Sequence, residues 1–309
     1  MTHEVRTRRD LTVVADRDAM AALAPLLPAW EEGGRLRVVL AGIPDAAQLA
    51  ALAERSDAVL VVGSRNRSPR TVLPGPFVTA TGGRPVPVAW LPATGAAALR
   101  TFALAAARVH ARWSDSVPRS RTFAVLGERH PRFDRLADRI LRLAQEDRSG
   151  ALRPVRWTAY EVDRAELARR LGHGPGLAVY VGHGRPIGWV GYAGLRAHHL
   201  DSPEPAAAII SLTCKTASRR RTGLSFAEAV PLRGVAAAAL GAVGPTLHTA
   251  NARWALRLTR AAATATTIGD LVTAVAPHDL GASSYRLVGD PTAPLLDPPD
   301  SPAWELEAS

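Results

Sequence analysis

Short apolar runs of five to eight residues constrain the fold of this chain more than any other feature. Residues 58–62, 177–181 and 206–213 are apolar almost throughout. A strand that is apolar on both faces needs a covering layer on each side, which a parallel sheet between helices provides. Between such runs, apolar residues recur at helical spacing, as over residues 95–113 and 132–144. The alternation predicts an α/β fold with a mostly parallel sheet.

The same pattern divides the chain into two α/β/α units that lie side by side. We expect an N-terminal unit over residues 1–114 and a second unit over residues 122–297. Residues 115–121 contain Ser, Asp and Pro without an apolar period and are interpreted as a linker, and residues 298–309 as a polar tail. A length of 309 residues is sufficient for two units of this kind.

Individual elements follow from the periodicity. The strands are expected at residues 36–40, 58–62, 122–126, 155–160, 177–181, 206–213 and 235–240. The helices are expected at residues 45–54, 95–113, 132–144, 163–171, 251–263 and 267–275, and residues 65–87, rich in Pro, Gly and Arg, are expected to form a loop.

Composition narrows the possible functions. The formal net charge is +10, but Lys215 is the only lysine among 38 basic residues, and the arginines alternate with acids. This resembles a compositional bias more than a nucleic-acid-binding surface, so nucleic acid is not expected as a partner. Cys214 is the only cysteine, which excludes an internal disulfide and any multi-cysteine metal site. Residues 1–10 contain no apolar signal-peptide core, and no long apolar stretch follows, so we expect a cytoplasmic protein without a membrane partner.

Two reactive side chains follow strands of the second unit. His183 comes after the strand at residues 177–181 and Cys214 comes directly after the strand at residues 206–213. Because the carboxyl ends of parallel strands meet at one edge of a sheet, the two side chains could face one another across a cleft. An imidazole can take the proton of a thiol and later deliver it to a leaving amine. The alternative is that Cys214 is a small core residue and His183 belongs to a turn.

The sequence around these residues resembles the gingipain family of cysteine peptidases, which are relatives of caspases. The resemblance rests on residues 61–63 (VVG), 90–93 (WLPA), 180–184 (YVGHG), 188–189 (GW), 209–214 (IISLTC), 225–229 (SFAEA), 234–238 (GVAAA) and 287–291 (LVGDP). It implies that the second unit is a caspase-like sheet and that the chain is a cysteine endopeptidase. No cofactor and no metal are expected, since nucleotide-binding and zinc-binding motifs are both lacking.

The resemblance also implies roles for individual residues. Cys214 would be the nucleophile, His183 the base and then the acid, and Glu128 the acid that orients the imidazole. The backbone N–H groups of Gly184 and Cys214 would bind the oxyanion. Trp189, beside the histidine motif, is expected to contact substrate.

Specificity is expected to depend on Asp134 and Trp254, which match the acid and the tryptophan of the family's P1 pocket. A buried, unpaired Asp134 carboxylate would pair with a substrate guanidinium or ammonium, and the Trp254 indole would form a wall. The resemblance therefore implies cleavage after Arg or Lys. The basic run at residues 219–221 could then be an exposed loop, a partner-binding patch or a self-cleavage site.

Two other functions remain open at the level of sequence. The more distant CHAT group shares the His and Cys pattern, so the chain could be an inactive or regulated scaffold that binds a partner peptide. The other alternative is a basic module that binds nucleic acid. The expected partners are thus a peptide or protein substrate and, in the regulated case, a protein partner.

Overall fold

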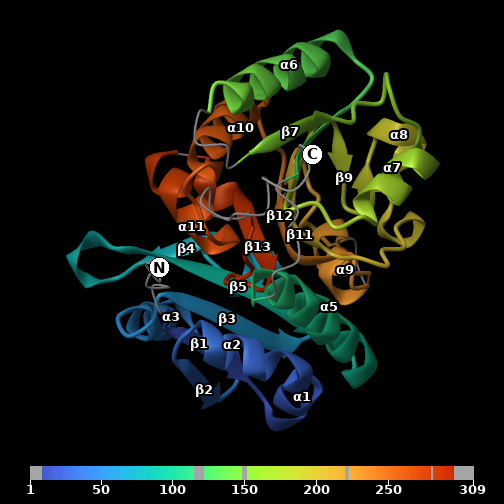
Figure 1. Cartoon of the computed structure of the whole chain (residues 1–309). Coiled ribbons are helices and arrows are strands. Elements are labelled where there is room, and N and C mark those ends of the chain that lie inside the picture. Colours follow the sequence, from blue (N-terminus) through green and yellow to red (C-terminus); the bar gives the residue numbers. More distant parts are fainter. Residues whose placement is uncertain (1–8, 115–121, 148–151, 220–222, 280, 296–309) are drawn as a thin grey trace, which may run out of the picture.

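One continuous sheet runs through the whole molecule. The structure, a computed structural model, describes residues 9–114, 122–147, 152–219, 223–279 and 281–295. Within these ranges the sheet has eleven strands, in the order β2-β1-β3-β5-β13-β12-β11-β8-β6-β7, with β4 paired to β5. Helices cover both faces, and the N-terminal unit forms the lower, blue part of Figure 1. The predicted linker and tail, residues 115–121 and 298–309, lie outside the described residues.

The N-terminal unit contains the first five strands. They are β1 (Leu11–Ala15), β2 (Leu36–Leu40), β3 (Ala58–Ser64), β4 (Phe77–Thr79) and β5 (Pro85–Ala93). Its helices are α1 (Arg17–Ala22), α2 (Leu27–Gly33), α3 (Ala46–Ala53), α4 (Pro69–Val72) and α5 (Ala96–Ser114).

The second unit supplies the remaining strands. They are β6 (Thr122–Gly127), β7 (Arg153–Arg156), β8 (Leu177–Val181), β11 (Ala206–Leu212), β12 (Ala236–Ala242) and β13 (Tyr285–Gly289), with a small hairpin of β9 (Gly184–Arg185) and β10 (Gly188–Trp189). Its helices are α6 (Pro131–Gln145), α7 (Arg164–Leu171), α8 (Gly191–Gly194), α9 (Phe226–Leu232), α10 (His248–Ala262) and α11 (Ile268–Val275).

The apolar runs form the parallel sheet that the sequence predicts. Every residue of β8, β11 and β12 is buried. These strands pair in parallel, β8 with β11 and β11 with β12, between helices on the two faces. The prediction of an α/β fold with a mostly parallel sheet is confirmed, because only strands covered on both sides can be apolar throughout.

Both units use the same strand order. Read from the outer edge, the N-terminal unit runs β2-β1-β3-β5 and the second unit runs β7-β6-β8-β11, with parallel pairing inside each. β13 joins them, since it pairs antiparallel with β12 and parallel with β5. The strands of the two units therefore run in opposite directions, and their carboxyl ends lie at opposite edges of the shared sheet.

Several elements differ from the sequence predictions, and α4 and β4 both lie inside the predicted loop of residues 65–87. β5 begins at Pro85, inside the predicted loop of residues 65–87, because its three prolines weaken the strand signal. The strand predicted at residues 155–160 ends at Arg156, and Thr158 starts a turn in which its carbonyl accepts from the Val162 N–H at 3.0 Å. The buried strand β1 was not predicted.

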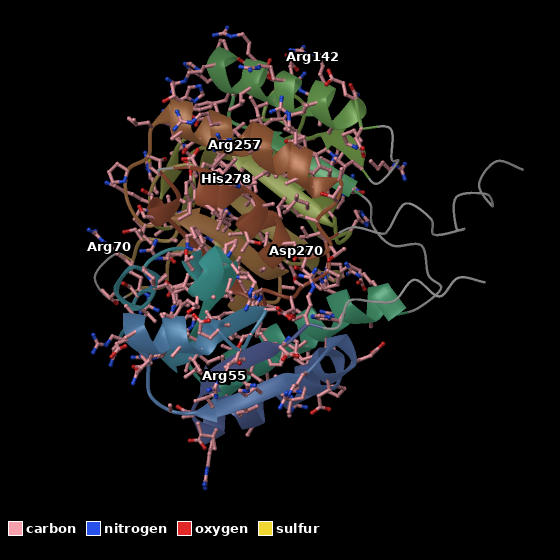
Figure 2. All side chains as sticks on the ribbon, turned by 90° about the vertical axis from the view of Figure 1, so that its left-hand side faces the viewer. Arg55, Arg70, Arg142, Arg257, Asp270 and His278 are labelled. Carbon is pink, nitrogen blue, oxygen red and sulfur yellow. The ribbon has the colours of Figure 1, made fainter. Side chains whose placement is uncertain are left out.

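Charged side chains are spread over the surface of both units. Arg55 lies at the lower end of the molecule and Arg142 at the upper end in Figure 2, with Arg70 and Arg257 between them. Among the described residues, no helix is both long and apolar enough to cross a bilayer.

A buried carboxylate ties β13 to the N-terminal unit. Asp290, at the end of β13, is fully buried, and one of its oxygens accepts from His110 Nε2 of α5 at 2.7 Å and from Trp30 Nε1 of α2 at 3.1 Å. Its other oxygen accepts from the N–H and the hydroxyl of Thr292. Burial alone would raise the pKa of Asp290, but the hydrogen bond and charge of His110 hold it below its usual range.

The substitution Asp290→Asn should lower the free energy of unfolding by about 3–5 kcal/mol at neutral pH, because it breaks a buried charge pair. The carboxyl pKa is depressed in the folded state, so this stabilisation is complete above the unfolded pKa of about 3.9 and disappears as the pH falls through the lower folded value. Denaturant unfolding as a function of pH measures both effects.

The matched control is Asp57→Asn, at an exposed ion pair with Arg84 of 3.2 Å. It should cost less than about 1 kcal/mol. Equal losses in the two variants would show that the Asp290 pair has no special role in joining the units.

Candidate active site

Three of the predicted site residues follow neighbouring strands at one edge of the sheet. Gly127 of β6 and Leu212 of β11 both pair with Val181 of β8, so the three strands end in register. Glu128, His183 and Cys214 follow within two residues of these positions. The parallel sheet thus brings together residues that are 55 and 31 positions apart in the sequence.

The Glu128 carboxylate binds His183 twice. Its Oε2 atom accepts from the His183 backbone N–H at 2.6 Å and lies 2.8 Å from Nδ1 of the ring. Because an ionised carboxylate can only accept, Nδ1 carries the proton and Nε2 keeps its lone pair. The Glu128 side chain is 17% exposed, whereas that of His183 is 55% exposed, so the free ring nitrogen is accessible to a substrate.

Cys214 is half-buried, and a backbone N–H points to its sulfur. The N–H of Thr246, in the loop after β12, donates to Sγ at 3.3 Å. The Thr246 carbonyl and hydroxyl oxygens each lie 3.6 Å from the same sulfur. Immediately after the thiol, Lys215 takes a left-handed φ of 62°, which turns the chain sharply out of the strand.

The histidine and cysteine loops touch at Gly184. A Cβ atom on Gly184 would lie 2.6 Å from the Cys214 carbonyl oxygen and 2.6 Å from the Thr213 side chain. Only glycine fits at this contact, which brings the predicted oxyanion residues Gly184 and Cys214 together. The His183 ring and the Cys214 thiol are not hydrogen-bonded to one another, and such contacts often tighten only when a substrate binds.

Trp189 supports the histidine loop from behind and does not face the site. Its side chain is 2% exposed, stacks on Tyr180 with 4.3 Å between ring centroids, and donates from Nε1 to the Ser211 hydroxyl at 2.8 Å. Tyr180 in turn donates from its hydroxyl to the His183 carbonyl at 3.2 Å. The prediction that Trp189 contacts substrate is therefore wrong, because the indole is enclosed in the core.

Trp254 is also a core residue. It is fully buried in α10 and stacks on Tyr285 of β13, with 4.6 Å between ring centroids. Within the described residues its Nε1 atom has no hydrogen-bond partner. The predicted wall of a P1 pocket is closed in this structure.

Asp134 differs from the prediction in its partner. Its carboxylate is half-buried in the first turn of α6 and pairs with Arg156 of β7. The same guanidinium forms ion pairs with Asp138 at 2.8 Å and with Glu161 at 3.2 Å. The expectation of an unpaired, buried carboxylate is wrong, because Arg156 lies between three acids. Partial burial would lower the pKa of Arg156, but the Asp134 bond and the neighbouring acids raise it, so the group stays charged.

A second imidazole stands beside the site and was not predicted. Phe133 of α6 packs edge-on against both His183 and His248, with centroid separations of 5.0 and 5.5 Å. Burial, followed by the nearby charges of Arg132, His130 and His183, lowers the pKa of His248. His248 and Thr246 both follow β12, so the rule that placed Cys214 could have located them.

Among the described residues, no group of three or more His, Cys, Asp or Glu side chains is arranged to hold a metal ion.

The substitution Arg132→Gln should raise the pKa of His248 towards the ordinary value of about 6.5, because it removes a positive neighbour. NMR titration of the imidazole carbon-bound protons measures this midpoint. Arg135→Gln, an exposed change on the same helix, is the matched control and should leave the midpoint unchanged. An equal response to both variants would contradict the local origin of the shift.

A known protein family and several solved structures are similar to this chain. The model of peptidase family C25 matches residues 123–296, more than half of the chain. The structure titled as the Arg specific cysteine proteinase gingipain R is 14% identical with a TM-score of 0.72, over 94% of this chain and 79% of that one. The complex of Porphyromonas gingivalis RgpB pro- and mature domains gives 14% and 0.70, over 94% and 80%.

The chain is also similar in structure, more distantly, to separase. In the Saccharomyces cerevisiae separase–securin complex, the matching chain is 12% identical with a TM-score of 0.51, and the match covers 75% of this chain and 16% of that one. No curated protein matches the sequence. With a caspase-like sheet, a cysteine and a histidine at its carboxyl edge and a family match over the second unit, the chain belongs to peptidase family C25, the gingipain family of cysteine peptidases.

Proposed function

We propose that the protein cleaves peptide bonds through a covalent acyl intermediate on Cys214. His183 is the base that takes the thiol proton. The observation that carries the proposal is the Glu128 bond to His183 Nδ1, at the strand end that touches the Cys214 loop through Gly184. An imidazole fixed in this way offers Nε2 as the proton acceptor.

The proposed reaction has two halves. The Cys214 proton passes to Nε2 of His183, and the thiolate attacks the scissile carbonyl carbon. The N–H groups of Gly184 and Cys214 bind the resulting oxyanion. The imidazolium then protonates the leaving amine, the C–N bond breaks, and a thioester remains on Cys214. Water attacks the thioester with His183 again as base, releasing the carboxylate product and the thiol.

Glu128 acts as a positioning residue for this cycle. Its carboxylate holds the ring tautomer and lies close enough to stabilise the imidazolium that forms after proton transfer. Its second bond, from the His183 backbone N–H, fixes the loop as well as the ring.

The substitution His183→Ala should lower kcat/KM for peptide hydrolysis by at least about 10²-fold, because general acid–base catalysis is lost. Cys214→Ala should abolish hydrolysis and leave unfolding unchanged, since Sγ is only partly buried. The rate of iodoacetamide labelling provides a second measurement, and Cys214 is the only thiol.

Labelling also separates the peptidase from a scaffold that binds a partner peptide. An activated thiol reacts fast and slows by about tenfold or more in His183→Ala. His198→Ala, an exposed histidine, is the matched control and should change neither rate. Slow labelling at the same rate in the wild type and in His183→Ala would favour the regulated CHAT-type scaffold and contradict the peptidase mechanism.

The finer proposal is a preference for Arg or Lys at P1. One similar structure is that of an Arg specific cysteine proteinase. The sequence resemblance aligns Asp134 with the acid of the family's P1 pocket. The surroundings of Asp134 add physical support. Three carboxylates (Asp134, Asp138 and Glu161) surround the single guanidinium of Arg156, so this cluster retains two negative charges that a substrate cation could balance.

The substitution Asp134→Asn should lower kcat/KM for Arg substrates by about tenfold or more, because it removes a carboxylate proposed to face the substrate cation. Asp57→Asn is the matched control, because it breaks an exposed ion pair with Arg84 in the N-terminal unit, outside this cluster. Fluorogenic peptides that differ only at P1 measure the effect. Comparable turnover of Arg, Leu and Asp peptides, or equal effects of the two variants, would refute this specificity.

Arg219 is a poor candidate for self-cleavage. Its side chain is 12% exposed and pairs with the fully buried Glu228, so it cannot enter a P1 pocket without breaking that pair. Arg220 and Arg221 lie outside the described residues.

A protein regulator is a further proposed partner. It is supported by two of the similar structures, which are complexes of RgpB pro- and mature domains and of separase with securin.

A further inference from the structure

A hollow lies in the N-terminal unit, away from the candidate active site. It has a volume of about 840 Å³ and is lined by residues that follow β1, β2 and β3, including Arg17, Leu40, Ile43, Ser64 and Arg67. This volume falls in the range of sites that bind small molecules. Because the two units run in opposite directions, the hollow and Cys214 lie at opposite edges of the shared sheet.

The hollow sits where the strand order reverses. From β1 the chain crosses to the edge strand β2, and from β2 it returns past β1 to form β3. β1 and β3 are neighbours whose following segments begin with α1 and α4, which pack on opposite faces in separate apolar clusters. Open α/β sheets bind ligands in the crevice that this reversal leaves. In the second unit, the equivalent strands β6 and β8 carry Glu128 and His183.

The lining combines free cations with an apolar wall. Neither the Arg17 nor the Arg67 guanidinium forms a hydrogen bond or an ion pair with the described residues, and both are exposed. The two acids of the lining are used locally, since Asp16 accepts from the Ala19 N–H at 2.7 Å and Asp45 from the Gln48 N–H at 2.8 Å. The apolar wall includes Leu40, which is 56% exposed.

We propose that this hollow binds an organic phosphate of about mononucleotide size. Arg17 and Arg67 would hold the phosphate, because a guanidinium matches phosphate oxygens with paired N–H donors. Leu40 and Ile43 would contact the apolar body of the ligand. The sequence lacks a glycine-rich phosphate loop, so recognition rests on these side chains and the site is one of binding, not of phosphoryl transfer.

Contacts lead from the hollow to the loop after the nucleophile. The segment after β3 that lines the hollow also contains Arg65, whose carbonyl accepts from Arg219. Arg219 follows Cys214 by five residues and pairs with Glu228. Trp90 provides a second connection between the segment after β3 and the partner of Arg219. Its ring packs against Gly63, and its Nε1 donates to Glu228 at 3.0 Å. Occupancy of the hollow should therefore alter the reactivity of Cys214.

Calorimetric titration of the full chain with ATP, AMP and inorganic pyrophosphate tests the site. ATP and AMP should bind, and Arg17→Gln and Arg67→Gln should each weaken binding by about tenfold or more. Arg55→Gln, which lies at the opposite end of the N-terminal unit's strands, is the matched control and should have no effect (Figure 2). Absence of binding at millimolar ligand, or equal weakening by all three variants, would overturn the site.

Two further measurements test the rest of the proposal. Leu40→Ser, at an exposed position, should weaken AMP but not pyrophosphate, and equal affinity of ATP and pyrophosphate would overturn the role of the apolar wall. Saturating ATP should change the rate of iodoacetamide labelling of Cys214 by about twofold or more, and this change should vanish in Arg67→Gln. An unchanged rate would overturn the connection. Labelling reads the thiol directly, so these outcomes do not depend on peptidase activity.

Discussion

The pairing of β13 with β5 on one side and β12 on the other makes one sheet out of two units. β13 comes from the end of the second unit but aligns Leu287 and Val288 with Ala89 and Trp90 of the first. Its antiparallel register with β12 then fixes the second unit in the reverse direction. Asp290, directly after β13, adds buried hydrogen bonds to α5 and α2, so the junction rests on ladder hydrogen bonds and on a buried carboxylate that would be destabilised if it lost these partners.

The candidate active site is buried at its base and accessible at its tip. β8 and β11 are buried along their whole length and end in register, which fixes the backbone positions of the residues that follow. Tyr180 and Trp189 then brace the histidine loop from the core side. The imidazole itself stays exposed. Packing against the core therefore orients the histidine loop, while the reacting atoms of the ring remain accessible to a substrate.

The sequence was sufficient to predict how the strands meet and insufficient to predict side-chain partners. Apolar runs imply parallel strands, and parallel strands place Glu128, His183 and Cys214 at one edge whatever their separation in the chain. The partner of Asp134 could not be inferred in this way, because Asp134 lies in helix α6, Arg156 lies at the end of strand β7, and no local sequence signal links the two. Trp189 lies beside the histidine motif and Trp254 matches the family's pocket tryptophan, yet both rings are buried in the core, where large aromatic side chains are stabilised. The Thr246 donor is a backbone group, which no residue type announces.

The buried carboxylate of Glu228 connects the N-terminal unit to the loop that follows Cys214. Its carboxylate is fully buried and accepts from Trp90 of the first unit, from Arg219 after the nucleophile, and from the backbone and hydroxyl of Ser225. An isolated carboxylate at this depth would be costly, and removing one partner of such a pair typically costs about 3–5 kcal/mol. The loop that leaves Cys214 is therefore held by the same charge that the N-terminal unit must help to satisfy. A shift of β5 or of the segment after β3 cannot leave Arg219 in place, so the geometry behind the thiol depends on how the first unit is packed.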